Sequence, residues 1–296
     1  MLKKLLGSVC SLVLLLLAFA PSETLAQGSL TPLNDDFTNP TTLASWRRVY
    51  AEEGWGADQL ESLDIGRTRS DWLTMVPRSS VWYQDWRGEL TFKPVQGDFV
   101  VTTRVHVSSR SGSGTPQSSF SLAGVMARVP NAQRSLWQPG HENYVFLSLG
   151  SADLPGTLQY EAKNTVDSDS RYQTSPSGTS EAYLQIARVG SVFILLAKAP
   201  NQPWVVMGRY DRPDMPAQLQ VGMTCYTDWD TCSALVPYTH NSTSITWGTP
   251  DLIAQYHYMR FERPVLPSAL QGVDLTDSSA APDDALRGFL GDAATW

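Results

Sequence analysis

The chain has 296 residues, with 22 Lys and Arg against 29 Asp and Glu, so its formal net charge is −7 at pH 7. This balance argues against nucleic acid or an anionic membrane as the partner, because both require a basic surface. Charged residues make up 17% of the chain, below the typical value of about 25%, whereas 10 Trp and 11 Tyr are present. This length and composition favour one large domain that is rich in aromatic residues.

The N-terminus has the pattern of a secretory signal peptide. Met1-Leu-Lys-Lys is followed by an apolar run from Leu12 to Ala20 and by the small residue Ala26. We expect cleavage after Ala26, which assigns residues 1–26 to the signal and predicts a secreted or periplasmic protein. An uncleaved anchor is the alternative, but the apolar run is shorter than the roughly 20 residues of a transmembrane helix.

Short predicted strands follow one another from residue 35 to residue 261. The clearest pair brackets the turn Gln96-Gly97-Asp98, with alternation from Thr91 to Val95 before it and from Phe99 to Val107 after it. The remaining strand candidates are bounded by Gly, Pro, Asn or Ser and comprise 119–128, 143–149, 158–164, 182–188, 192–199, 204–210, 219–225 and 256–261. No segment after the signal shows helical periodicity, so the sequence predicts an all-β fold.

Three other segments complete this organisation. Asp35-Asp36-Phe37 is expected to open the first strand and to pair with the last, at 256–261. Residues 108–118 and 164–180 are rich in small polar residues and are predicted to be loops.

Several short motifs occur in an order that resembles a known superfamily. Trp86-Arg-Gly-Glu-Leu90 precedes the turn Gly97-Asp98-Phe99, and Leu184-Gln-Ile-Ala-Arg188 precedes Gly190 and a further strand. This order resembles secreted bacterial domains of the concanavalin A-like lectin/glucanase superfamily, including its enolase-regulation-like and laminin-G-like members. The resemblance covers residues 35–261 and implies two antiparallel sheets packed as a jelly-roll sandwich. It also implies a concave face that in some members binds or hydrolyses glycans.

The end of the chain and the cysteines lead to two further expectations. Residues 27–263 form the predicted sandwich domain, and residues 264–296 look like an acidic, solvated tail in which a short helix near 284–290 is an alternative. Cys10 is expected to leave with the signal, so Cys225 and Cys232 remain as a close pair. In an exported protein such a pair predicts a disulfide.

A first candidate ligand-binding set lies between the two regions of alternation. Trp82, Tyr83 and Trp86 occur within five positions of one another. Aromatic rings stack on the apolar face of a sugar ring while polar side chains bind its hydroxyl groups. The set therefore predicts a glycan-binding surface, and the alternative is that one or two of these rings fill the core.

A second candidate set lies on the next strands and the loop before them. The loop and the start of its strand supply Trp137, His141, Glu142 and Tyr144. Gln159, Glu161 and Lys163 alternate on the following strand, so they share one of its faces. A ligand groove would explain these polar side chains, and an ordinary solvent-facing side of a sheet is the alternative.

Catalysis by these residues is a second hypothesis. Glycoside hydrolysis needs two carboxylates about 5 Å apart for retention, or further apart for inversion. The candidate pair is Glu142 with Glu161, and Glu89 with Glu161 is the alternative. A polysaccharide lyase would instead use Tyr or His as base beside a cation, and His106, His141 and Tyr160 are the residues of that type.

No cofactor is expected. A structural calcium ion near Asp35 and Asp36, or near Asp228 and Asp230, is an alternative, although two aspartates fall short of the six or more oxygens that calcium takes. We therefore predict a monomeric glycan-binding protein without nucleic-acid or membrane partners. The alternatives are a carbohydrate-active enzyme using the same face, and an envelope interaction module without a sugar site.

Overall fold

The computed structural model describes residues 28–291, and these form two antiparallel seven-stranded sheets packed face to face. The predicted signal peptide lies outside the described residues. Among residues 28–291, no helix is long and apolar enough to cross a membrane. The all-β prediction is confirmed.

Each sheet is named here for its central strand. The β6 sheet has the strand order β1 (Arg47–Arg48), β4 (Glu89–Gln96), β13 (Gln218–Tyr226), β6 (Ser121–Arg128), β7 (Tyr144–Ser151), β8 (Leu158–Val166), β9 (Asp169–Pro176). The β5 sheet has the order β12 (Val205–Asp211), β11 (Val192–Lys198), β10 (Glu181–Val189), β5 (Phe99–Ser108), β14 (Ile253–Glu262), β3 (Leu73–Pro77), β2 (Leu60–Ile65).

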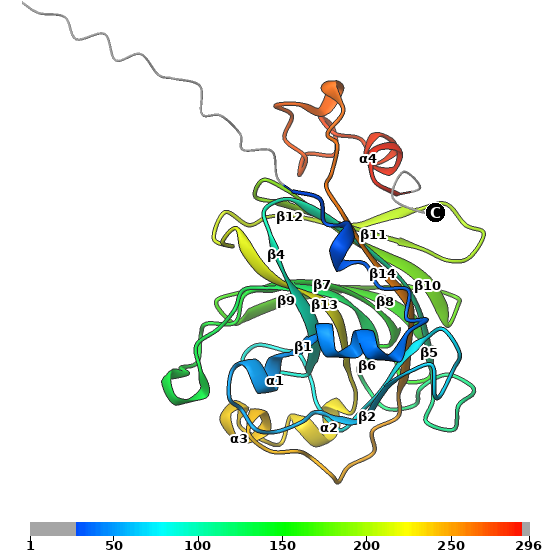
Figure 1. The fold of residues 1–296 in the computed structure, drawn as a ribbon, viewed down its shortest axis with the longest axis vertical. Helices are drawn as coiled ribbons and strands as arrows, with labels where there is room; N and C mark the ends of the chain where they lie inside the picture. The colour runs from blue at the N-terminus through cyan, green and yellow to red at the C-terminus, as the bar shows by residue number, and fades with distance from the viewer. Residues whose placement is uncertain (1–27, 292–296) are drawn as a thin grey trace, which may run out of the picture.

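The helices are short, and the α-helices lie outside the two sheets (Figure 1). The α-helices are α1 (Val49–Glu52), α2 (Trp229–Cys232), α3 (Pro237–Asn241) and α4 (Asp283–Phe289). The 3₁₀ helices are η1 (Thr31–Leu33), η2 (Pro40–Ser45), η3 (Arg134–Leu136) and η4 (Ser268–Leu270). In Figure 1, α1, α2 and α3 lie together at the end of the molecule opposite α4.

Alternation along the strands builds the core between the two sheets. On β5, Phe99, Val101, Val105 and Val107 are buried and belong to this core, as the alternation predicted. Gly97 adopts φ 74° in the turn before β5, a conformation that a glycine adopts without steric cost. The predicted opening strand is reduced to one isolated bridge, Asp35 with Met259, because the chain next to it forms η1 and η2.

The C-terminal segment is not a solvated tail over residues 264–291, and that expectation was wrong. Leu270, Leu275, Leu286 and Leu290 are buried against the outer face of the β5 sheet, in a cluster that includes Trp204. These apolar residues are spaced among the aspartates, so the composition of the segment did not predict that it packs on the sheet. The alternative for this segment, a short helix near 284–290, is present as α4.

The predicted disulfide is also wrong, because Cys225 and Cys232 are both free and buried. Cys225 points into the core between the sheets, where its Sγ lies 3.8 Å from Met75 Sδ. Cys232 belongs to a different cluster, shared with Tyr226, the residue after Cys225. Since successive side chains of a strand point to opposite faces, the two thiols lie on opposite sides of the β6 sheet.

A buried histidine in the segment that covers the β6 sheet makes stability depend on pH. Burial lowers the pKa of His240 to about 4, against an ordinary value of 6.5, although its Nδ1 lies 2.9 Å from Asn241 Oδ1. Below pH 6.5 His240 is protonated in the unfolded chain but stays neutral in the folded chain. The free energy of unfolding therefore falls as the pH drops toward 4.

We expect acidification from pH 6.5 to 4 to lower the free energy of unfolding, with His240 contributing up to about 3 kcal/mol of the loss. Urea titrations at half-unit pH steps measure this slope. His240→Gln should flatten it, and His141→Gln, at an exposed position, is the matched control. An unchanged slope in His240→Gln would contradict the prediction.

Candidate functional site

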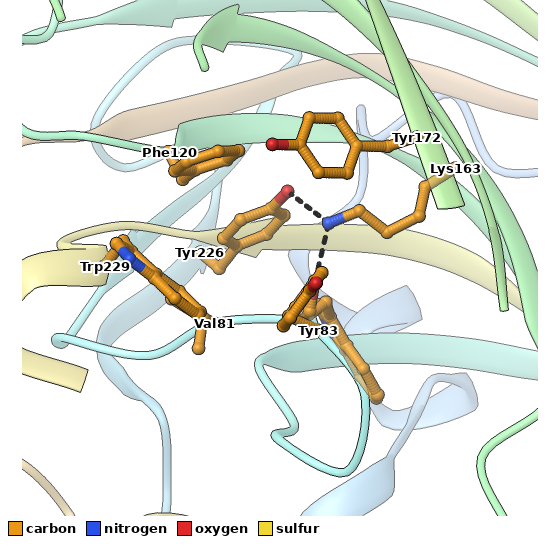
Figure 2. A pocket seen from close by; sticks show the side chains of 8 residues that line it. Val81, Tyr83, Phe120, Lys163, Tyr172, Tyr226 and Trp229 are labelled. Carbon is orange, nitrogen blue, oxygen red and sulfur yellow. Dashed lines mark hydrogen bonds between the residues drawn. The ribbon is translucent and has the colours of Figure 1, made fainter. Parts of the chain in front are cut away.

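A pocket opens on the outer face of the β6 sheet, between the sheet and the segments that cover it. It encloses about 170 Å³ and is lined by eight residues, six of which are aromatic. These residues are Val81, Trp82, Tyr83, Phe120, Lys163, Tyr172, Tyr226 and Trp229. Figure 2 shows the Lys163 amine directed among the aromatic side chains.

The covering segment before β4 supplies three of these residues and is held at several points. Ser80 forms an isolated bridge with Thr227, and Tyr83 forms one with Trp86 across a tight turn. The buried Trp82 ring donates from Nε1 to the Glu89 carbonyl at 3.1 Å. These contacts fix the segment against β13, so Trp82 and Tyr83 face the pocket.

Lys163 and Glu161 form a buried ion pair beside the aromatic rings. Lys163 Nζ lies 2.7 Å from Glu161 Oε1 and donates to the Trp82 carbonyl at 2.7 Å. Its contact with the Tyr226 hydroxyl is longer, at 3.4 Å, while that hydroxyl donates to Glu161 Oε2 at 3.2 Å. The ammonium also lies within 6 Å of the rings of Tyr83, Phe146, Tyr172 and Tyr226, at 5.7, 4.9, 5.4 and 5.4 Å.

Burial governs the ionisation of these groups. It lowers the pKa of the Lys163 amine, an effect that the Glu161 carboxylate opposes. It raises the pKa of the Tyr226 hydroxyl well above its ordinary value, and the nearby Glu161 charge acts in the same direction. Tyr226 is therefore a neutral hydroxyl at physiological pH, able to donate one hydrogen bond and accept another.

The structure brings five of the predicted residues to this region. Trp82, Tyr83 and Lys163 line the pocket, and Glu161 lies behind Lys163. Tyr144 lies in the adjoining wall, with its ring 5.4 Å from that of Trp82.

Four other predicted residues lie elsewhere or beside the pocket. Trp86 donates to the Leu235 carbonyl at 2.9 Å, and Gln159 donates to Asp153 Oδ1 at 3.0 Å, so both tie the surrounding chain together. Trp137 packs at 5.5 Å from Trp55 in a separate cluster, and His141 is exposed.

Glu142 is part of a buried ion network and does not line the pocket. Its carboxylate accepts from Arg87 Nε at 2.5 Å and from Arg128 Nε at 2.8 Å, and both guanidinium groups also bind Glu53. Burial alone would raise the pKa of Glu142, but the two guanidinium groups outweigh burial and lower it to about 2. Glu142 thus remains a paired anion, which is unlike a catalytic carboxyl that has to exchange protons.

Sequence reasoning missed the pocket residues that come from other segments. Phe120 precedes β6, Tyr172 lies on β9 and Trp229 begins α2. Their rings meet, with Phe120 at 5.8 Å from Tyr172 and 6.1 Å from Trp229. The only signal in the sequence was the aromatic character of single residues, since residues 164–180 were predicted as a loop.

The aspartates considered for calcium have structural partners instead. Asp35 accepts from the Trp46 indole at 2.9 Å, and Asp228 accepts from Ser79 Oγ at 2.6 Å and from the Thr249 amide at 2.7 Å. Within residues 28–291, no group of three or more His, Cys, Asp or Glu side chains could hold a metal ion. Asp35 also accepts from the Phe37 amide in a turn, and Asp228 caps the N-terminus of α2.

No protein-family model matches the sequence, and no curated protein matches it. Solved structures are similar in fold. A functionally unknown protein from Saccharomyces cerevisiae has a TM-score of 0.51 and 13% identity over 76% of this chain and 99% of that chain. The GH43 protein BlXynB of Bacillus licheniformis has a TM-score of 0.51 and 10% identity, over 78% of this chain and 39% of that one.

A third structure, the xyloglucan PUL GH43B of Bacteroides ovatus, has a TM-score of 0.50 and 12% identity, over 83% of this chain and 41% of that protein. The chain thus spans about two fifths of the length of both GH43 proteins. The chain is a two-sheet antiparallel jelly-roll sandwich. At these identities the similarity shows the fold alone, because one such scaffold hosts many functions.

Proposed function

We propose that this protein is a secreted or periplasmic glycan-binding protein and that the aromatic pocket is its binding site. The observation that carries the proposal is the pocket's composition: six aromatic side chains surround one buried Lys–Glu pair. Rings offer apolar faces to the C–H face of a sugar, while Lys163 and the Tyr226 hydroxyl offer hydrogen bonds to its hydroxyl groups.

The neighbours in fold support a sugar ligand over other small molecules. One of them is described as the xyloglucan PUL GH43B, and another as a GH43 protein. Among sugars, the first of these descriptions makes xyloglucan the first polymer to test.

A carbohydrate-active enzyme is the second candidate, and the site geometry favours it less. None of the eight lining residues is a carboxylic acid. Glu161 is held by Lys163 and Tyr226, and Glu142 is held by two arginines in a separate network. A glycosidase needs two carboxyl groups flanking one bond, and this pair does not meet that requirement.

The proposal predicts that Tyr172→Ala and Trp229→Ala each weaken glycan binding at least about tenfold, because each removes a ring from the pocket wall. Retention on insoluble polymers and quenching of tryptophan fluorescence measure binding to xyloglucan, xylan, arabinan, cellulose and polygalacturonate. Trp229→Ala removes one fluorophore, so its affinity is measured by calorimetry.

Tyr238→Ala is the matched control, because Tyr238 is a 45% exposed ring that packs with Trp55 and Trp137, away from the pocket. Equal binding by all three variants would refute the pocket as the site. Release of reducing ends from any polymer would favour the enzyme hypothesis.

A further inference from the structure

Most of the outer face of the β6 sheet is filled by the chain's own covering segments. Leu90, Phe92 and Met126 project from β4 and β6 and pack in one buried cluster with Val49 and Ile245 of the covering segments. A polymer therefore has no room to lie across β4, β13 and β6 on this face.

The covering segments are also fastened to the sheet by charge. Arg87, in the segment before β4, pairs with Glu142 beside β7 and with Glu53 after α1. Arg128 of β6 pairs with the same two carboxylates. All four side chains are at most 3% exposed, and breaking such pairs is costly. The network thus holds the segment that carries Trp82 and Tyr83 against the sheet.

The space that remains is small. The pocket volume of about 170 Å³ lies below the roughly 300–1,000 Å³ of pockets that hold drug-sized ligands. It suits one sugar ring better than several linked rings.

The charge inside the pocket is already balanced. The Lys163 ammonium is paired with Glu161, so an acidic sugar would find no unpaired cation, and a cationic ligand would meet the ammonium among the rings. The third N–H of Lys163 has only the 3.4 Å contact with Tyr226 and can turn toward a ligand oxygen. An uncharged hydroxyl group is the ligand chemistry that this arrangement accepts without breaking the ion pair.

We infer that the pocket recognises a single uncharged sugar residue at the end of a glycan chain. The inference rests on the proposed function and specifies its ligand. The terminal ring enters the aromatic pocket with its hydroxyl-bearing edge toward Lys163 and Tyr226. The next residues of the glycan remain outside, where the covering segments offer no continuous groove.

The test uses residues 27–296 and whichever of the four uncharged polymers named above, xyloglucan, xylan, arabinan or cellulose, is retained. Retention of polygalacturonate alone would overturn the inference. Calorimetry measures the affinity for its monosaccharide and for its oligosaccharides of two to six units, together with the matching uronic acid. We expect affinities that agree within about threefold from one unit to six, and at least about tenfold weaker binding of the uronic acid. The intact polymer should compete in proportion to the molar concentration of its chain ends.

The outcomes separate the inference from the proposed function. A steady rise in affinity with each added unit, or tighter binding of the uronic acid, would overturn the inference while leaving glycan binding in place. Retention of none of the five polymers, together with no heat from any of their monosaccharides, would overturn both. Tyr172→Ala should weaken binding of the monosaccharide and the hexamer by the same factor, whereas a groove would lose less affinity for the hexamer.

Discussion

Replacing Arg128 with Ala should lower the free energy of unfolding by about 3–5 kcal/mol, because it leaves buried carboxylates without their partner. Arg128 is fully buried and bonds Glu53 at 2.7 Å, Glu142 at 2.8 Å and Gln220 at 2.6 Å. Arg87 alone cannot neutralise both carboxylates. Urea unfolding followed by tryptophan fluorescence measures the loss.

Arg171→Ala is the matched control for this change. Arg171 and its partner Asp169 are 84% and 67% exposed, and exposed pairs contribute about 0–1 kcal/mol. A similar small loss in both variants would show that the buried network does not hold the covering segments to the sheet.

Replacing Lys163 with Met should also be strongly destabilising, by about 3–5 kcal/mol, because the fully buried Glu161 then loses its countercharge. The methionine side chain is unbranched and packs well against aromatic rings, so lost packing is a minor part of the effect. The added substitution Glu161→Gln should return the stability to within about 1 kcal/mol of the wild type, since replacing both members of a buried pair is often close to neutral.

Comparing Lys163→Met with the double variant distinguishes an effect on stability from an effect on glycan binding. The double variant Lys163→Met with Glu161→Gln should fold but bind glycan at least about tenfold more weakly than the wild type, as it lacks the ammonium donor. A double variant as unstable as Lys163→Met alone would show that the two groups do not act as a pair. Unchanged binding by the folded double variant would remove Lys163 from the site.

The strands with regular alternation were predictable because their pattern is local. Phe99, Val101, Val105 and Val107 share one face of the segment 99–107, and β5 spans Phe99–Ser108 with this set inside. The strands that sequence reasoning missed lack this pattern. In β9, residues 169–176 are mostly exposed and polar, and the strand exists because it pairs along the whole of β8.

The candidate site was predictable only in part, because only the contacts within one strand follow from a local pattern. Lys163 and Glu161 were recognised because alternation places them on one face of β8, and the structure keeps them together. Glu142 was grouped with them because it is near in sequence to β7, but two arginines from distant segments surround it. Those arginines, and the aromatic partners Phe120 and Trp229, carry no sequence signal that links them to β8.

The sequence by itself determined the all-β class and the shared face of Glu161 and Lys163 on β8, because side-chain alternation and turn residues act over a few positions. Tertiary structure alone decided that Cys225 and Cys232 stay apart, that residues 264–291 pack on the β5 sheet, and that a pocket replaces an open face. These features depend on contacts between segments far apart in the chain. Burial and charge pairing stabilise such contacts, and a local sequence pattern does not show which distant segments will meet.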